Sequence, residues 1–170
     1  NGAIPILKKV AKFKEKPFRK IISARKPFGL STSFRGLKEK KDKENKILLF
    51  ANKNKGYVKE NKIIKNNNWI KDYKLFVPYA IGSGDSKSDI VKPILAEPGS
   101  ACTETYLVFG PFASKKRAEN AMTYINTKFF HFLLTLKKNT QHATSTAYEF
   151  VPLQNFNESW NDQKLFEKYE

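Results

Sequence analysis

A chain of 170 residues, 40% hydrophobic and 14% aromatic, is long enough for one domain with a substantial core, and this composition excludes wholesale disorder. No run of about 18 apolar residues occurs, so a membrane span is excluded, and lysines near the start make a signal peptide unexpected. The single cysteine, Cys102, excludes an internal disulfide and favours a reducing, cytoplasmic compartment. Because the only methionine is Met122, we expect the chain to be either processed or a fragment of a longer protein.

The net charge of +16 is carried by the first part of the chain. Residues 1–74 contain 22 of the 32 basic residues but 6 of the 16 acidic ones, whereas residues 75–170 are balanced. Such an asymmetry is typical of proteins that bind a polyanion, most often nucleic acid and less often an anionic membrane. The alternative is that the many lysines only keep the protein soluble, which does not explain the neutral second part.

The first half of the chain predicts a helix followed by short strands. Apolar residues at helical spacing predict an amphipathic helix or arm over residues 4–14, which Pro17 ends. Pro27 and Gly29 require a loop, and Pro78 is typical of an edge strand or a bulge. In chain order, we expect a strand at residues 20–23, a charged loop at 38–46, a strand at 46–51, a hairpin turn at 52–56, a return strand from 57, helical turns at 61–67, and strands at 73–80 and 92–97.

The second half predicts one long helix in the core. After a strand at residues 104–110, Ser114 is a typical N-cap, and apolar residues then recur at spacings of three and four as far as Leu136. This pattern predicts one continuous helix, with a break near Asn126 and Thr127 as the alternative. A polar loop at 137–145, a strand at 148–151 and a helix at 162–170 complete the expected elements.

Together these elements predict an α+β fold in which a mixed or antiparallel sheet packs on one long core helix. We expect residues 1–19 to form an N-terminal basic arm or helix and residues 20–170 to form the domain itself.

The basic part contains the first group of candidate DNA-contacting residues. Three of the four arginines lie there, and a planar guanidinium group matches both the guanine edge and phosphate. In the loop at 24–36, Phe28 would either wedge against a base or anchor the loop in the core. The lysines would contact phosphates, which position a protein without reading sequence. The candidates are Arg19, Arg25, Lys26, Phe28, Arg35, Lys38, Lys53, Lys55 and Lys59.

The polar loop at 137–145 contains the second group. Asn and Gln side chains can pair bidentately with adenine, although composition alone favours a polar turn here. The candidates here are Lys137, Lys138, Asn139, Gln141 and His142.

The residues that common catalytic sites require are scarce in this sequence. With two histidines and one cysteine, a Cys/His zinc site cannot be assembled, and the Gly82-Ser83-Gly84 loop lacks both nucleotide-binding glycine patterns. A Mg²⁺-dependent nuclease remains an alternative, since Asp42, Glu60 and Lys62 loosely fit an Asp followed by Glu-x-Lys. We therefore predict no catalytic or metal-binding residue in this chain.

Four segments, taken together, resemble the C-terminal target-recognition region of adenine-specific type II restriction–modification DNA methyltransferases. The resemblance covers roughly residues 20–170, and the polar loop followed by a strand ending in Val-Pro is also similar, more loosely, to type I specificity subunits. The segments are SARKPFGL at 23–30, EPGSACTETYLV at 97–108, the stretch from TKFF through KKNTQ to FVP within 127–152, and WND with LF and KY within 160–169.

The resemblance implies a role in DNA recognition. In that family an upstream Rossmann-like domain binds S-adenosylmethionine and carries an Asn/Asp-Pro-Pro-Tyr/Phe motif, which this sequence lacks. The resemblance therefore implies a non-catalytic target-recognition domain, with double-stranded DNA and an upstream methyltransferase domain as partners and no cofactor of its own. A nuclease fragment and a general RNA- or anionic-surface-binding domain remain the alternatives.

Overall fold

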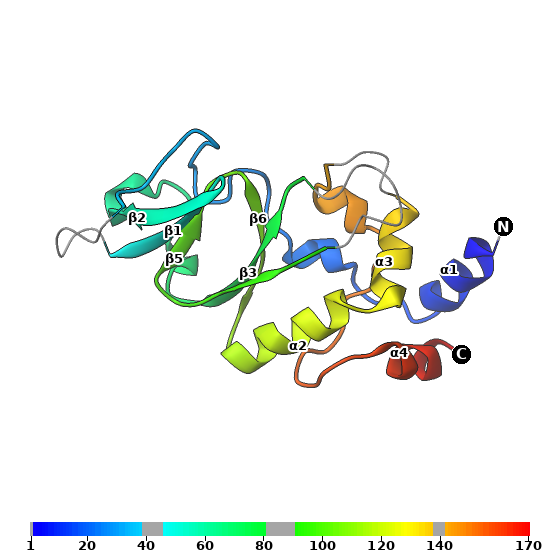
Figure 1. Cartoon of the computed structure of the whole chain (residues 1–170). Coiled ribbons are helices and arrows are strands. Elements are labelled where there is room, and N and C mark those ends of the chain that lie inside the picture. The colour runs from blue at the N-terminus through cyan, green and yellow to red at the C-terminus, as the bar shows by residue number, and fades with distance from the viewer. Residues whose placement is uncertain (1, 39–45, 81–90, 138–141) are drawn as a thin grey trace.

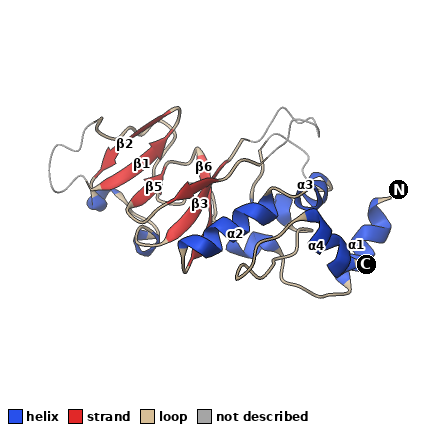
Figure 2. Cartoon of the chain, turned by 60° about the horizontal axis from the view of Figure 1, so that its bottom comes forward, coloured by secondary structure: helices blue, strands red, loops and turns tan. Residues whose placement is uncertain are grey.

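The chain forms an α+β fold with three layers. The computed structural model describes residues 2–38, 46–80, 91–137 and 142–170. The chain has two three-stranded sheets. In Figures 1 and 2 one sheet lies at one end of the molecule, the other lies in the middle, and the α-helices gather at the other end. The described helices are α1 (Ala3–Ala11), α2 (Lys115–Ile125), α3 (Lys128–Thr135) and α4 (Asp162–Tyr169), with short 3₁₀ helices η1 (Phe18–Ile21), η2 (Glu60–Lys62), η3 (Asn67–Trp69) and η4 (Ser145–Tyr148).

The outer sheet is mixed and the middle sheet is antiparallel. The outer sheet has the order β2-β1-β5, in which β1 pairs antiparallel with β2 and parallel with β5. The middle sheet has the order β4-β3-β6, and both of its pairings are antiparallel. The strands are β1 (Ile47–Ala51), β2 (Asn54–Val58), β3 (Tyr73–Pro78), β4 (Ile94–Ala96), β5 (Ser100–Cys102) and β6 (Tyr106–Phe112).

Strand β3 contributes side chains to two separate cores. Because side chains alternate along a strand, Leu75 and Val77 enter the core shared with the helices, whereas Phe76 enters the core between the two sheets.

The prediction that Pro78 marks an edge strand or a bulge holds only locally: β3 is the central strand of its sheet, but its pairing with β4 ends at Phe76, and Pro78 pairs only with Tyr106 of β6. Pro78 is the last residue of β3 and lies beyond the residues that pair with β4, so its missing N–H breaks no bond between those two strands. Backbone bonding on the β6 side continues past it, since the Tyr79 N–H donates to the Thr105 carbonyl at 2.9 Å.

Two predicted strands are mostly 3₁₀ helix. In place of a strand at 20–23, η1 ends at Ile21, and only residues 22–23 pair with β6: Ile22 bridges Phe109, and Ser23 N–H donates to the Val108 carbonyl at 2.8 Å. In place of a strand at 148–151, η4 is followed by an isolated bridge between Pro17 and Pro152. Both segments are short and apolar, and such a sequence fits a strand as well as a 3₁₀ helix.

Residues 2–19 are not a separate arm, because two of their apolar residues lie in the helical core. Val10 and Phe18 belong to the same buried cluster as α2, α3 and α4. The Phe18 N–H also donates to the Val151 carbonyl at 2.7 Å, which ties this segment to the far end of the sequence. The boundary expected at residue 19 therefore does not divide the structure.

The long core helix is two helices. Helix α2 ends at Ile125, and Thr127 caps a new helix by accepting the Phe130 N–H through its hydroxyl at 3.1 Å. Asp162 at the start of α4 accepts the N–H groups of Lys128 and Phe129 at 3.1 and 2.9 Å. These caps satisfy backbone donors that a continuous helix would have bonded internally, so the break is stable.

Asp162→Ala should lower the free energy of unfolding by about 1–2 kcal/mol, since it removes both acceptors at the start of α3. Urea denaturation of the variant beside the wild type measures this loss. The neighbouring Gln163→Ala, on the exposed face of α4, should change stability by less than about 0.5 kcal/mol. Equal stabilities of Asp162→Ala and Gln163→Ala would contradict the capping role.

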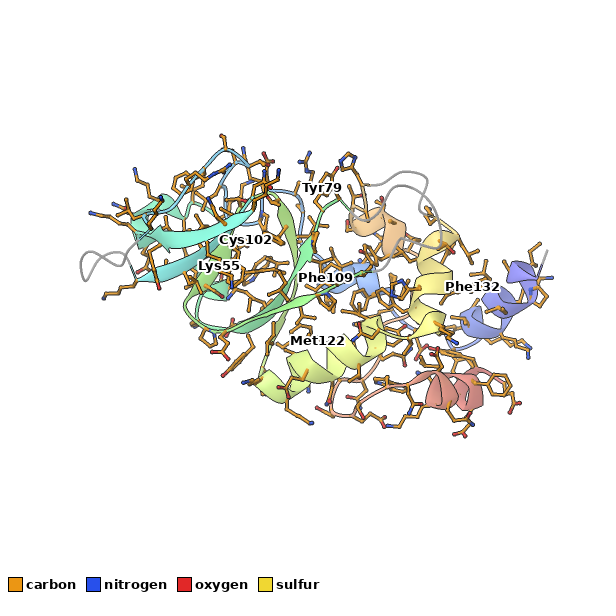
Figure 3. All side chains as sticks on the ribbon, viewed as in Figure 1. Lys55, Tyr79, Cys102, Phe109, Met122 and Phe132 are labelled. Atoms are coloured by element: carbon orange, nitrogen blue, oxygen red, sulfur yellow. The ribbon has the colours of Figure 1, made fainter. Side chains whose placement is uncertain are left out.

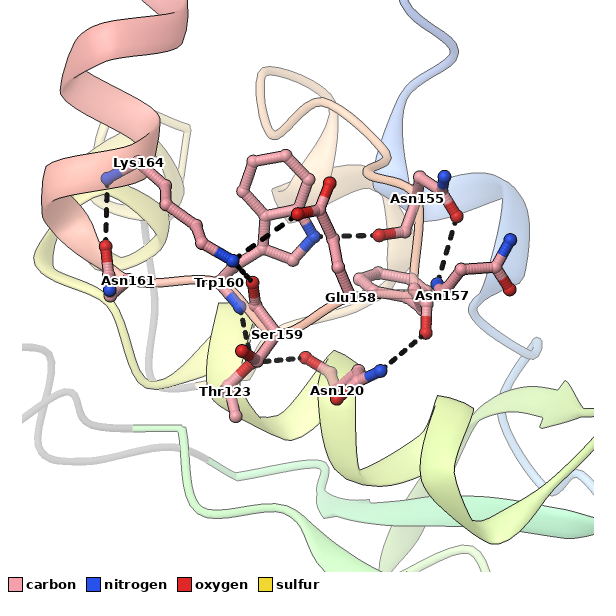
Figure 4. Close-up of polar contacts among 10 residues, drawn as sticks. Asn120, Thr123, Asn155, Asn157, Glu158, Ser159, Trp160, Asn161 and Lys164 are labelled. Carbon is pink, nitrogen blue, oxygen red and sulfur yellow. Dashed lines mark hydrogen bonds and ion pairs between the residues drawn. The ribbon is translucent and has the colours of Figure 1, made fainter.

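The segment that leads to α4 is fastened to α2 by side-chain hydrogen bonds, as Figure 4 shows. The buried amide of Asn120 donates to the Phe156 carbonyl at 2.9 Å, and the Trp160 N–H donates to the Thr123 hydroxyl at 2.9 Å. These bonds set the position of α4, and so place Asp162 against α3.

No helix within the described ranges combines the length and apolar character needed to cross a membrane.

Candidate nucleic-acid interface

Three segments far apart in the sequence meet at the Tyr79 side chain. Tyr79 follows β3 directly; the Arg25 guanidinium carbon lies 4.1 Å from the centroid of its ring, and the His142 ring stacks on it at 4.8 Å between centroids, with the planes 22° apart. The backbone reinforces the meeting, because Ala143 N–H donates to the Tyr79 carbonyl at 3.1 Å and Ala80 pairs with His142. Figure 3 shows Tyr79 at the upper edge of the molecule, whereas Cys102 and Phe109 lie inside it.

We call Arg25, Tyr79 and His142 the Tyr79 cluster. Two of its members, Arg25 and His142, are sequence-predicted site residues from different loops, and the structure brings them together. Tyr79 was missed by sequence reasoning, because an aromatic residue at the end of an apolar strand gives no signal that distinguishes it from a core residue. The side chains of Arg25 and His142 are exposed and that of Tyr79 is half-buried, so a ligand can reach the cluster.

The loop that carries Arg25 is anchored in the core between the sheets. Phe28 is fully buried, and its ring contacts those of Trp69 and Phe76 edge to face, with centroids 6.3 and 6.4 Å away. Of the two roles considered for Phe28, the structure therefore shows the core anchor, and a buried ring cannot wedge against a base. Asn66 fixes the same loop by donating its side-chain amide N–H to the Pro27 carbonyl at 2.7 Å.

Gly29 lets the Arg25 loop pass close to the Ile64 side chain. Its φ of +80° lies in the left-handed region, and a Cβ there would lie 2.2 Å from a side-chain carbon of Ile64. Any other residue would both strain the backbone and clash. The loop therefore presents Arg25 from a fixed backbone.

Glu104 holds the guanidinium group from the other side. Its carboxylate lies 3.6 Å from Nη2 of Arg25, and its second oxygen accepts the Thr32 N–H at 3.3 Å. The Glu104 N–H donates to the Leu30 carbonyl at 2.9 Å. Glu104 thus fastens the ends of the Arg25 loop to the start of β6 and pairs with the arginine.

The other two arginine candidates make different contacts. Arg19 forms an ion pair with Glu149, with 2.9 Å between Nε and Oε2, which ties η1 to the segment after η4. Arg35 donates to the carbonyl oxygens of Thr32 and Phe34 at 2.5 and 3.0 Å, so it stabilises its own loop. None of these contacts involves the Tyr79 cluster. Lys26, beside Arg25, is half-buried and has a positive φ of 57°.

Lysine candidates gather around the β1–β2 hairpin, at the end of the molecule opposite α1 and α4 (Figure 1). Lys53 and Lys55 are exposed on the hairpin, and Lys55 lies over the Phe50 ring at 4.7 Å. Lys38 is exposed next to Leu37, which pairs with Tyr57 of β2 through two backbone hydrogen bonds of 2.8 Å. Lys59 follows β2 and is half-buried. Three exposed lysines therefore lie on the β1–β2 hairpin and on the segment that pairs with β2.

The second loop is described only at its ends. Lys137 is exposed, and its ammonium group lies 5.4 Å from the centroid of the Phe150 ring. Lys138, Asn139 and Gln141 lie outside the described residues.

The described part of the chain contains no assembled metal-binding site of the kind that a Mg²⁺-dependent nuclease requires. No group of three or more His, Cys, Asp or Glu side chains gathers there in a way that could hold a metal ion. Of the residues considered for a nuclease, Glu60 and Lys62 are exposed on the short helix η2, and Asp42 lies outside the described residues.

Two groups with shifted pKa values, Lys74 and Cys102, lie inside the protein. Burial lowers the pKa of Lys74 to about 8, although Cys102 and Asp72 act in the opposite direction. Burial raises the pKa of the Cys102 thiol well above its usual value, which makes this cysteine a poor nucleophile. Both side chains are fully buried between the two sheets and are not accessible to a substrate.

Comparison of this chain with protein-family models, with curated proteins and with solved structures finds no match. The case for a function therefore depends on the residues themselves.

Proposed function

We propose that this chain is a sequence-specific recognition module for double-stranded DNA, and that in a longer protein it positions a target adenine for an upstream adenine-specific methyltransferase domain. The observation that carries the proposal is the Tyr79 cluster, since it joins the two loops expected to contact DNA at one accessible edge. The asymmetric charge of the sequence supports it as well.

The proposal divides the contacts into two kinds. The exposed lysines around the β1–β2 hairpin contact phosphates, which supplies affinity for any sequence. The Arg25 loop contacts base edges in the major groove, because its arginine is presented from an anchored backbone. An anchored loop loses little conformational freedom on binding, which favours specificity.

The methyltransferase part of the proposal rests on the resemblance of the four sequence segments. In that family the upstream domain binds S-adenosylmethionine, which supplies the methyl group. This chain would bind and orient the duplex, so that the target adenine can be flipped into the upstream pocket. No residue of this chain is assigned a role in the transfer step.

Titration of fluorescent duplex DNA at several salt concentrations tests duplex binding. We expect log K to fall linearly with log salt, with a slope of several units, at roughly 0.9 per phosphate neutralised. The triple variant Lys38→Gln, Lys53→Gln, Lys55→Gln should reduce the slope by up to about 2.7 and weaken binding to all sequences alike.

The matched control replaces Lys92, Lys116 and Lys128 by Gln, which removes the same charge from the balanced second part. We expect its slope to equal that of the wild type. A flat salt response of the wild type, or an equal loss in both triple variants, would rule out the proposed phosphate-contacting edge. Stronger binding to single strands or RNA would favour the general nucleic-acid-binding alternative, and Mg²⁺-dependent cleavage lost in Glu60→Ala would favour the nuclease.

A further inference from the structure

The Arg25 side chain is held by Tyr79 and Glu104, and neither contact is a hydrogen bond from its guanidinium N–H groups. Its described contacts are the face of the Tyr79 ring, at 4.1 Å, and the Glu104 carboxylate, at 3.6 Å from Nη2. Stacking on an aromatic ring orients the guanidinium plane, and 3.6 Å is longer than a hydrogen bond. With half of the side chain exposed, its N–H groups can donate to a ligand.

The Glu104 side chain is itself held in place by the surrounding structure. Its side chain is 23% exposed, and one carboxylate oxygen accepts the Thr32 N–H. A fixed ring and a fixed carboxylate hold a planar donor group in one orientation. This arrangement suits a ligand that has two acceptors in a plane.

Arginine commonly binds either a phosphate or the edge of a guanine base, and the Glu104 carboxylate beside Arg25 favours guanine. A phosphate brought to Arg25 would lie close to the negative charge of Glu104 and be repelled by it. The major-groove edge of guanine offers the same two-acceptor geometry through O6 and N7, and it carries no net charge. The exposed lysines of the hairpin have no such carboxylate partner among the ion pairs between described residues, and they suit phosphate better.

We infer that Arg25 reads a guanine in the DNA target, with Tyr79 and Glu104 as the residues that position it. This inference rests on the proposed function and adds to it one base of the recognition sequence. The target contains a G·C pair whose replacement by A·T weakens binding by roughly 5- to 150-fold, the range for one bidentate contact.

The test begins with selection of bound duplexes from a randomised library by the wild-type chain. Dissociation constants are then measured for the selected duplex and for versions in which each G·C pair is replaced in turn. In Arg25→Lys the preference at one G·C position should fall to less than about 3-fold, because a point charge cannot donate in a planar fork. Affinity for random duplex should stay within about 3-fold.

The positioning residues have their own expected results. Tyr79→Leu and Glu104→Gln should each weaken the preference at the same position and at no other. Glu104→Gln should also bind random duplex slightly more tightly, because a negative charge is removed. Arg117→Lys is the matched control, since Arg117 lies on α2 and donates to the Asn157 side chain, and it should keep the preference. Thermal melting of each variant checks that it is folded.

The outcomes separate the inference from the proposed function. No binding of duplex DNA by the wild type contradicts both. Binding without any sequence preference also contradicts both, whereas a G·C preference that survives Arg25→Lys contradicts the inference alone. Loss of preference at an A·T position instead would show that Arg25 acts on another base and would also overturn it.

Discussion

Phe18→Ala is expected to lower the free energy of unfolding by about 3–5 kcal/mol, enough to unfold most of the chain if its stability is ordinary. Phe18 is fully buried, and its removal leaves a cavity at the centre of the helical core. Equilibrium unfolding in urea, followed by circular dichroism, measures the loss. The rings within 5.2–6.4 Å of Phe18 are those of Phe109, Tyr124, Phe130, Tyr148 and Phe156.

Phe166→Ala is the matched control, since the same side chain is removed from a position that is 64% exposed on α4. We expect a change below about 1 kcal/mol there. The same reasoning predicts that residues 1–19 cannot be removed as a dispensable arm, because the deletion takes Phe18 with it. Similar stabilities of the two alanine variants would show that the N-terminal segment does not belong to the core.

Lys74→Met is expected to raise the free energy of unfolding by about 1–3 kcal/mol at pH 7. Burial holds the pKa of Lys74 near 8 in the folded chain, whereas an exposed lysine titrates near 10.5. The difference corresponds to about 3 kcal/mol against the charged form. The hydrogen bonds that Nζ donates, to the Asp72 carbonyl at 3.0 Å and the Ser100 hydroxyl at 3.3 Å, reduce the gain from its removal.

The pH dependence identifies the cause. Below pH 8 the amine is protonated in both states, so the cost of the buried charge is fully present. Between pH 8 and 10.5 the unfolded chain binds the extra proton, so wild-type stability rises with pH through this group. The advantage of Lys74→Met should therefore shrink across this interval. Urea denaturation of both proteins from pH 7 to 10.5 measures it, with exposed Lys71→Met as the control; an advantage that is constant with pH would exclude the buried charge as its cause.

The sequence predicts element types well where the signal is local. Ser114 was expected as an N-cap, and it accepts a backbone N–H of its own helix, as Asn161 does at the start of α4. The break at Thr127 was only an alternative, because α2 and α3 pack against the same core and their apolar spacing continues through the break. The acceptor that stabilises the break, Asp162, belongs to another helix, and sequence spacing carries no information about that contact.

The candidate site depends on contacts that the sequence alone cannot give. Arg25 and His142 were chosen separately, for the chemistry of their side chains, and only the fold places both against Tyr79. Phe28 had two possible roles, because an aromatic residue in a Pro-Gly loop can face either way. Glu104 lies in a strand-like apolar segment, and its role depends on the Arg25 loop being folded over the start of β6.

The position of β3 between two cores makes the folded chain a single cooperative unit. Leu75 and Val77 pack against the helices while Phe76 packs against the outer sheet, so opening either core uncovers one face of the same strand. Partial unfolding that spares β3 is therefore costly, and the two halves should be lost together. Tyr79 lies directly after this strand, so the orientation of Arg25 and His142 should persist under heat or denaturant until the whole chain unfolds.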